Sequence, residues 1–403
     1  MRKLGLLPRV LLAIALGIAI GYVSPGWLVQ AIATFNGLFG NFLGFAIPLI
    51  IIGFIAPGIG MMGKGAGRLL GLTTFIAYSS TVLAGLLAFF TAQVLYSFIL
   101  VNQSSQTFDS PEESLVKAFF TVDMPPVMGV MTALFIAFTL GLGMATSKGD
   151  TLLNVMNEFR TIVEKLIKKI IIPLLPFHIF GIFANMTYGG QVGVIMSVFI
   201  KVFIMIIALH SLYLIIQYSV AGSVSKQNPL TMIKTMFPAY FTALGTQSSA
   251  STIPVTLERT KKLGVRERIA DFSIPLLANI HLSGSTITIV SCAVAVMMIQ
   301  GETATFGALF PFILMLGVTM IAAPGVPGGG VMASLGLLES MLGFNATMIS
   351  LMIALYLAQD SFGTACNVAG DGAITALTDK LIKSDHELDN PMQDNEAKLL
   401  GNF

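Results

Sequence analysis

The sequence contains little charge for its length. Only 10% of its 403 residues are Asp, Glu, Lys or Arg, whereas 55% are hydrophobic. A water-soluble domain carries about 25% charged residues. The net charge of +2 offers no basic surface of the kind that binds nucleic acid, so a nucleic-acid partner is excluded. Most of the surface therefore does not face water, and the composition indicates a membrane protein with lipid as its surroundings.

Cysteine and long polar segments are also scarce. The two cysteines, Cys292 and Cys366, lie in apolar runs and do not form a C-x-x-C pair. This argues against a disulfide framework and against a zinc site. The polar residues at 384–403 are predicted to form a disordered cytoplasmic tail. No polar segment is long enough to build a separate soluble domain.

Long apolar runs are what the sequence has instead. A helix needs about 20 apolar residues to cross the core of a bilayer. The eight runs predicted as spans are 8–24, 37–62, 69–100, 127–146, 161–188, 191–221, 268–299 and 346–378. Two further apolar stretches are interrupted, 229–258 by Ser/Thr clusters and Pro254, and 303–343 by the Pro/Gly run at 324–330.

The placement of Lys and Arg predicts the orientation of the spans. With the N-terminus inside and both interrupted stretches treated as re-entrant hairpins, only Lys117 and Lys201 of the 22 Lys/Arg residues fall away from the cytoplasmic side. A full crossing by either stretch would scramble this bias. The sequence therefore predicts an all-α polytopic membrane protein with eight transmembrane helices and two re-entrant helical hairpins. Both termini would lie on the cytoplasmic side of the plasma (inner) membrane.

The two interrupted stretches also indicate a transported solute. Paired, broken apolar segments in a membrane protein mark the substrate site of a transporter. In the first stretch, Ser248 and Ser249 offer hydroxyl and N–H groups that can hold a carboxylate, although serine also serves as glue between helices. In the second, the glycines and prolines of 324–330 exclude a regular helix. This run is interpreted as a gate of the transporter, and a plain external loop is the alternative.

The last span carries polar residues on one face. Asp360, Thr364, Asn367 and Asp371 are spaced i, i+4, i+7 and i+11, which places them within roughly 60° of arc on a helix. Carboxylates are costly in a membrane and usually mark a site with a cation partner. Asp360 could bind an ammonium group and Asp371 a metal cation. The alternative is that Asp371 lies in the interface at the end of the helix.

The preceding span contains His281 and Ser285, one helical turn apart. Histidine titrates near neutral pH, so His281 could couple protons to transport. A hydrogen-bonded structural role is the other interpretation, and the sequence leaves both open.

These motifs resemble the dicarboxylate/amino acid:cation symporter family, the glutamate transporter homologues, and are closest in character to its sodium/serine-threonine branch. The resemblance covers nearly the whole chain. It is carried by Gln247-Ser248-Ser249 to Pro254, Ile274-Pro275 to Ser285, Gly325-Val326-Pro327-Gly328, and Asp360 to Asp371. It implies a homotrimeric, inverted-repeat, elevator-type secondary active symporter. The implied scaffold is 1–62 and 115–188, and the implied moving transport domain is 69–100 and 191–378.

The resemblance also assigns roles to residues. Asp360 would bind the amino group of the substrate, and Thr364 and Asn367 its α-carboxylate. The full substrate site would be Ser248, Ser249, Ser285, Val326, Gly328, Asp360, Gly363, Thr364 and Asn367. One sodium site would combine Asp371 with the carbonyls of Leu277, His281 and Asn367, and a second would use the carbonyls of Asn279, Ile321 and Ala323. One or two sodium ions are therefore expected as co-transported ions.

Two departures from the family pattern bear on the substrate. Members that carry acidic substrates have an arginine three residues after the aspartate or just before the serine run, where this chain has Gly363 and Gln247. An acidic side chain would be buried without a cation, which is expensive. We therefore expect a small neutral amino acid such as serine, threonine or alanine. Proton coupling and an acidic amino acid or dicarboxylate remain alternatives within the family. Ser283 replaces the carboxylate of a third sodium site, which makes that site doubtful.

Two other classes are disfavoured. An intramembrane aspartyl protease needs two carboxylates that share a proton, but Asp360 and Asp371 are 11 residues apart on one predicted helix, or about 16 Å. A channel needs a filter repeated by symmetry around one pore, whereas the predicted site is built from unlike segments. The sequence therefore predicts a transporter and not an enzyme.

Overall fold

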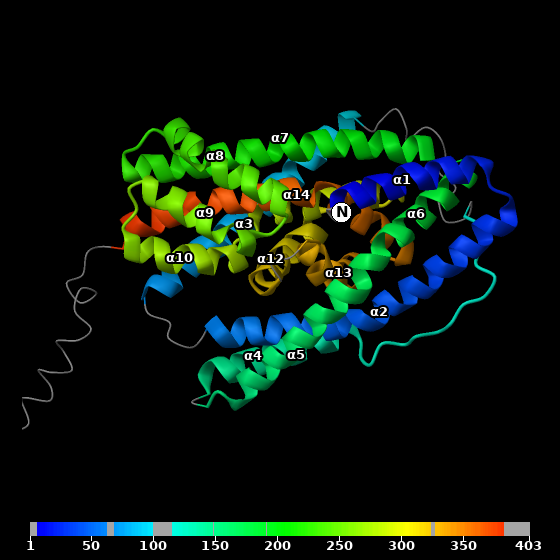
Figure 1. The fold of residues 1–403 in the computed structure, drawn as a ribbon, viewed down its shortest axis with the longest axis horizontal. Coiled ribbons are helices and arrows are strands. Elements are labelled where there is room, and N and C mark those ends of the chain that lie inside the picture. Colours follow the sequence, from blue (N-terminus) through cyan, green and yellow to red (C-terminus); the bar gives the residue numbers. More distant parts are fainter. Residues whose placement is uncertain are drawn as a thin grey trace, which may run out of the picture.

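All the regular secondary structure is helical over the part of the chain described by a computed structural model, residues 6–62, 68–99, 115–147, 149–190, 192–323 and 327–382. Figure 1 shows long helices that run along one axis of the molecule. The helices are α1 (Leu6–Val23), α2 (Gly26–Met62), α3 (Arg68–Ile99), α4 (Val130–Thr146), α5 (Thr151–Leu166), α6 (Ile172–Tyr188), α7 (Val192–Ser225), α8 (Pro229–Thr246), α9 (Ser249–Lys262), α10 (Glu267–Ile280), α11 (Ser283–Ile299), α12 (Phe306–Ala322), α13 (Gly329–Leu342) and α14 (Ala346–Leu381). The all-α prediction is confirmed.

Six helical segments among the described residues are long and apolar enough to cross a membrane. They are Gly26–Met61, Arg68–Tyr96, Thr151–Tyr188, Ile195–Ser225, Glu267–Ile299 and Ala346–Leu381. The predicted spans 8–24 and 127–146 correspond to the shorter apolar helices Pro8–Val23 and Thr132–Thr146. The membrane-protein prediction fits this architecture, while the count of eight spans stays a prediction.

The helix that ends at Tyr188 begins earlier than predicted. It starts at Thr151 and passes through a π-helical turn, Ile167–Ile171, into α6. The additional turns, 151–160, carry the charged side chains Glu158 and Arg160, and Arg160 pairs with Glu164 of the next turn at 3.4 Å. Such a polar segment lacks the apolar signal by which a span is recognised, so the pattern starting at 161 identified only the apolar part of the helix.

The predicted span 268–299 is broken in the middle. α10 ends at Ile280 and α11 begins at Ser283, and the backbone of His281 and Leu282 is not helical. The amide side chain of Asn367 on α14 accepts hydrogen bonds from the N–H groups of Gly284, at 2.7 Å, and Ser285, at 3.3 Å. A helix start inside protein needs such a partner because its first N–H groups have none within the helix.

Both interrupted stretches fold as pairs of packed helices. α8 and α9 form hairpin 1, with its turn at Gln247 and Ser248, and α12 and α13 form hairpin 2. The predicted end of hairpin 1 at 258 falls short of the observed end at Lys262. Residues 324–326, at the turn of hairpin 2, lie outside the described part. The entry of each hairpin into a membrane from opposite sides stays a prediction.

The interior of the protein is built around α11 and α14. In the most apolar 18-residue stretch of each span, 94% of the residues are buried for Glu267–Ile299 and 89% for Ala346–Leu381. The corresponding share for Ile195–Ser225 is 44%. Figure 1 shows α14, in orange to red, lying between α7 and α8 on one side and α10 on the other. The polar side chains of α14 from Gln359 to Asp379 therefore lie inside the protein.

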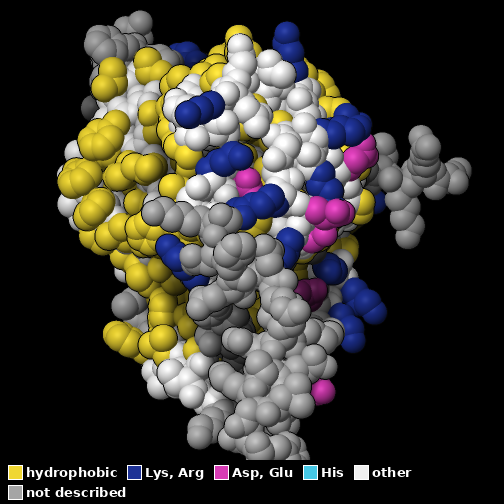
Figure 2. Space-filling view, turned by 90° about the vertical axis from the view of Figure 1, so that its left-hand side faces the viewer, with side chains coloured by type: hydrophobic (Ala, Val, Ile, Leu, Met, Phe, Trp, Pro, Cys, Tyr) yellow, Lys and Arg dark blue, Asp and Glu magenta, His cyan; other side chains and the backbone are white. Residues whose placement is uncertain are grey.

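Lys and Arg side chains gather at one end of the molecule, where α9 and α10 meet and α14 ends (Figure 2). There the Arg266 Nε lies 2.7 Å from Asp379 Oδ1, and its terminal nitrogen donates to the carbonyls of Asp379 and Ile382. A guanidinium group is well suited to the last carbonyls of a helix, which have no partner within it. This clamp fastens the end of α14 to the start of α10.

Candidate functional site

The polar stripe predicted on the last span faces the interior of the protein. Asp360, Thr364, Asn367 and Asp371 all lie on α14, and their exposed fractions are 5%, 6%, 1% and 1%. Residues spaced this way share one face of a helix. Two buried carboxylates therefore lie on the same side of α14, each with its own set of partners.

Asp360 is contacted by hairpin 2. The N–H group of Gly328, just before α13, donates to Asp360 Oδ2 at 2.7 Å. Gly328 has φ +75°, a left-handed conformation that favours glycine. The hydroxyl of Tyr356, one turn earlier on α14, also hydrogen-bonds Asp360 and the side chain of Ser285. The predicted substrate residues Gly328, Asp360 and Ser285 are thus brought together, whereas Val326 lies outside the described residues.

Asn367 joins α14 to the start of α11. Its Oδ1 accepts from Gly284 and Ser285, and its Nδ2 donates to Ser285 Oγ at 3.0 Å. The two helices approach so closely here that a β-carbon on Gly284 would collide with the carbonyl of Gly363 and with Cys366. An amide has two acceptor positions and two N–H donors. The three bonds to α11 leave one N–H group of Asn367 for a ligand.

Gly363 occupies the position at which acidic-substrate members have an arginine. An added β-carbon would lie 3.5 Å from Ser285 N and 3.5 Å from Thr288 Oγ1. These are ordinary van der Waals distances to α11. The side of α14 beside Asp360 is therefore lined by glycine and hydroxyl groups, and no Lys or Arg occurs on α14 before Lys380.

Asp371 is paired with His281 in the break between α10 and α11. His281 Nδ1 lies 2.9 Å from Asp371 Oδ1, and the histidine is fully buried. On the other side of the ring, Nε2 lies 3.0 Å from Ser80 Oγ and 3.3 Å from Gln217 Nε2. A cation bound at Asp371 would therefore share the carboxylate with an imidazole.

The other residues predicted to bind sodium lie at the ends of α10 and α12. The carbonyl of Leu277 accepts from His281 N at 2.9 Å. Ile321 packs with Leu277 and with a small apolar cluster that includes Ile374 of α14. Ala323, two residues after Ile321, is buried, and Asn279 is half-buried. Carbonyl oxygens from these two helix ends suit a hard cation such as sodium better than a transition metal.

Hairpin 1 presents its serines beside α14. Ser248 accepts from Ser251 N through its Oγ at 3.3 Å and so caps α9, and Thr246 Oγ1 lies 3.1 Å from Thr252 Oγ1. Ser248 and Ser249 are buried at 9% and 4% exposure. The N-terminus of α9 adds N–H groups that favour an anion.

Several partners were missed at the sequence level. Tyr356 could have been found, because it precedes Asp360 by four residues and so shares its face of the helix. Ser80 on α3 and Gln217 on α7 gave no such signal, since they meet His281 only through tertiary packing.

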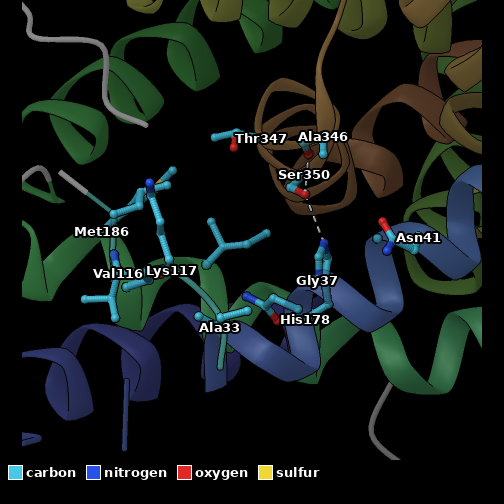
Figure 3. Close-up of a pocket in the computed structure, with 16 residues that line it drawn as sticks. Ala33, Gly37, Asn41, Val116, Lys117, His178, Met186, Ala346, Thr347 and Ser350 are labelled. Carbon is cyan, nitrogen blue, oxygen red and sulfur yellow. Dashed lines mark hydrogen bonds between the residues drawn. The ribbon is translucent and has the colours of Figure 1, made fainter. Parts of the chain in front are cut away.

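A separate cavity of about 310 Å³ lies between α2, α6, residues 115–118 and the start of α14 (Figure 3). Its polar residues include Asn36, Lys117 and His178, and His178 Nε2 lies 3.0 Å from Ser350 Oγ. Ser350 precedes Asp360 by ten residues on α14, or about 15 Å along the helix. The cavity is therefore distinct from the polar stripe.

Comparison with known proteins identifies relatives over nearly the whole chain. The family model described as the sodium:dicarboxylate symporter family matches residues 6–381. The Serine/threonine transporter SstT of Acinetobacter baumannii strain AYE is 25% identical over 391 residues, which are 94% of this chain and 97% of that protein. An Excitatory amino acid transporter of Caenorhabditis elegans is 27% identical over 259 residues, 62% of this chain and 51% of the relative. The matched segment thus spans about half the length of the nematode protein.

Proposed function

Because the chain belongs to the sodium:dicarboxylate symporter family, we propose that it couples sodium influx to the uptake of a small neutral amino acid. The protein is a multi-pass membrane transporter and not an enzyme, as its family and relatives are transporters. Serine, threonine and alanine are the proposed substrates. Its proposed location is the inner membrane, with both termini in the cytoplasm and with three copies in the assembly.

The observation that carries the neutral substrate is that α14, which is described over its whole length, places no basic side chain beside Asp360. α14 has no Lys or Arg before Lys380, and Gly363 lies against hydroxyl and backbone groups of α11. A substrate carboxylate beyond the α-carboxylate would be buried without a cation, which costs far more than burying a neutral hydroxyl or amide group. The name of the Acinetobacter relative as a serine/threonine transporter supports the same substrate class.

In the proposed bound state, the substrate ammonium group contacts the Asp360 carboxylate. Its α-carboxylate meets the remaining N–H group of Asn367, the hydroxyl of Thr364 and N–H groups at the hairpin tips. The N-terminus of α9, at Ser248 and Ser249, contributes a positive partial charge to this end of the substrate. Ser285, Gly328, Gly363 and Val326 would complete the site.

The proposed sodium sites follow the residues predicted from the family. Asp371 would bind one ion with the carbonyls of Leu277, His281 and Asn367, and the carbonyls of Asn279, Ile321 and Ala323 would bind a second. A zwitterion carried with one sodium moves one net charge, worth about 2.3 kcal/mol per 100 mV. The His281–Asp371 contact at 2.9 Å favours a second candidate, in which protons replace sodium at this carboxylate.

An elevator motion of the transport domain, 69–100 and 191–378, against the scaffold, 1–62 and 115–188, is part of the proposal. The end of α12 packs on the end of α2 predicted to be cytoplasmic, since a β-carbon on Gly58 would lie 2.9 Å from the Ala322 side chain. The cavity at Asn36 and Ser350 lies toward the opposite end of α2. This arrangement supports an inward-shifted transport domain.

Uptake of radiolabelled amino acids into proteoliposomes tests the proposal. With an inward sodium gradient, we expect saturable serine uptake that disappears when choline replaces sodium and that excess glutamate does not inhibit. Asp360→Asn should lose this uptake. Asp271→Asn is the matched control for that variant, because Asp271 pairs with Lys261 at 2.8 Å on the charged end of the molecule, away from the candidate site. Preference for glutamate over serine would overturn the substrate class. Uptake driven by a proton gradient alone would favour the proton-coupled candidate.

A further inference from the structure

Tyr356 lies inside the protein where three helices meet. It is among the largest fully buried side chains, with an exposed fraction of 1%. Its hydroxyl hydrogen-bonds the side chains of Asp360, one turn later on α14, and Ser285, in the first turn of α11. Neither the motif reasoning nor the family resemblance assigned a role to this residue.

The third helix at the hydroxyl is α13 of hairpin 2. A β-carbon built on Gly330 would lie 2.6 Å from the Tyr356 hydroxyl oxygen, 3.4 Å from the Tyr356 ring carbon that bears it, and 3.5 Å from Ser285 Cβ. The first of these distances is too short for any real contact, and the other two are acceptable. The backbone of α13 at Gly330 therefore packs directly against the Tyr356 hydroxyl oxygen. Glycine at position 330 permits this close approach because it has no β-carbon.

A chain of hydrogen bonds runs from this contact across the candidate site. Asn367 Nδ2 donates to Ser285 Oγ at 3.0 Å, Ser285 contacts the Tyr356 hydroxyl, and that hydroxyl contacts Asp360. Gly328 N reaches the same carboxylate at 2.7 Å, two residues before Gly330. The groups at the two ends of the chain, Asp360 and Asn367, are those proposed for the ammonium and the carboxylate of the substrate.

We propose that Tyr356 is a positioning residue that holds the Asp360 carboxylate toward the substrate and, with Gly330, sets how α13 packs beside that carboxylate. This inference rests on the proposed function for the identity of the substrate. A hydroxyl that touches Asp360 and the hairpin at once transmits any shift of the carboxylate to α13, because both contacts share one oxygen atom.

A double-mutant cycle of Tyr356→Phe and Gly330→Ala tests the proposal. Tyr356→Phe keeps the ring but removes one hydrogen bond to a charged group, so we expect the KM for serine to rise roughly tenfold with little change in maximal rate. Gly330→Ala places a methyl group against the hydroxyl oxygen, so uptake should fall by more than that and the unfolding temperature should drop. In the double variant the methyl group meets only the ring, and both properties should return to those of Tyr356→Phe alone.

Two control variants separate this contact from general damage. Tyr96 is also fully buried, and its hydroxyl donates to the Ser291 carbonyl at 3.1 Å, away from the candidate site, so Tyr96→Phe should leave the KM unchanged. Gly307, on the other helix of hairpin 2, has open space at its β-carbon position, so Gly307→Ala should be tolerated.

The outcomes distinguish the inference from the proposed function. A double variant that is as impaired as Gly330→Ala, or a Tyr356→Phe variant with an unchanged KM, would overturn the inference. If the unmodified protein carried an amino acid other than serine, the substrate proposal would fail, yet the same cycle measured with that substrate and by thermal unfolding would still decide the role of Tyr356.

Discussion

The two helical hairpins have the same architecture but are held together by different means. In hairpin 1 the turn is stabilised by its own side chains, since Ser248 caps α9 and Thr246 contacts Thr252. In hairpin 2 the inner helix α13 begins after a left-handed glycine and has no side-chain cap. Its leading N–H group at Gly328 donates instead to Asp360 on another helix.

This difference indicates which hairpin responds to the substrate. At the turn of hairpin 1, the hydroxyls of Thr246, Ser251 and Thr252 bond to other groups of the same hairpin. The start of α13 depends on the carboxylate that is proposed to bind the substrate ammonium group. A ligand shifts a conformational equilibrium only through a difference in its interactions with the two states. We therefore expect substrate binding to act on the start of α13.

Among the variants that test the difference between the two hairpins, Asp360→Asn should have the largest effect. The amide keeps the size of the side chain but loses the charge that attracts both the substrate ammonium group and the Gly328 N–H group. We expect serine affinity to fall by about 10- to 100-fold, in line with about 1.5–3 kcal/mol for hydrogen bonds to charged groups. Equilibrium binding of labelled serine in detergent measures it. Unchanged affinity would remove Asp360 from the site.

Gly328→Ala should have the next largest effect, on hairpin 2 alone. The residue has φ +75°, and a β-carbon there would lie 3.0 Å from Leu357 Cδ2. A left-handed non-glycine residue costs about 1–2 kcal/mol. We expect the free energy of unfolding to fall by about that amount and serine binding to weaken, because the start of α13 no longer fits over Asp360. Thermal unfolding without serine measures the stability, and the additional stabilisation by serine measures the binding. A variant as stable as the unmodified protein in both conditions would contradict the claim that position 328 requires glycine.

Ser248→Ala should weaken hairpin 1 more modestly. It removes the side-chain acceptor that caps α9, and loss of a serine cap typically costs about 1 kcal/mol. Since the change leaves the Asp360–Gly328 bond intact, hydrogen exchange should accelerate at 249–252 and stay the same at the start of α13. Faster exchange in α13 would show that Ser248 also stabilises hairpin 2.

Gln247→Gly should have the smallest effect and the opposite sign. Gln247 is one of two non-glycine residues with positive φ among the described residues, at 53°. Glycine relieves that strain but gains entropy in the unfolded chain, so the net stabilisation should stay below about 1 kcal/mol. Thermal unfolding measures it. A loss of stability would mean that the Gln247 side chain contributes contacts of its own to the turn.

The parts of the structure that follow from local sequence were predicted well. The helix-breaking run at 324–330 and the Ser/Thr turn near 248 predicted both hairpins, because breakers act on their own segment. The spacing of Asp360 and Asp371 predicted their shared face, because helical periodicity is a local property.

Features that depend on distant partners were not predicted. The break at His281 and Leu282 lies in an apolar run without proline or glycine at the break itself, and it is stabilised by Asn367, more than 80 residues later. Ser80 and Gln217 became partners of His281 only when α3 and α7 packed beside it. The start of the helix at Thr151 was missed because its first turns are polar.

Hydrogen–deuterium exchange of both hairpins in one sample tests the central claim most directly. Addition of serine with sodium should slow amide exchange across 327–342 of the unmodified protein and leave 229–262 unchanged, and Asp360→Asn should abolish the slowing. Equal slowing in both hairpins, or undiminished slowing in hairpin 2 of the Asp360→Asn variant, would contradict the role of Asp360 as the link between substrate and hairpin 2.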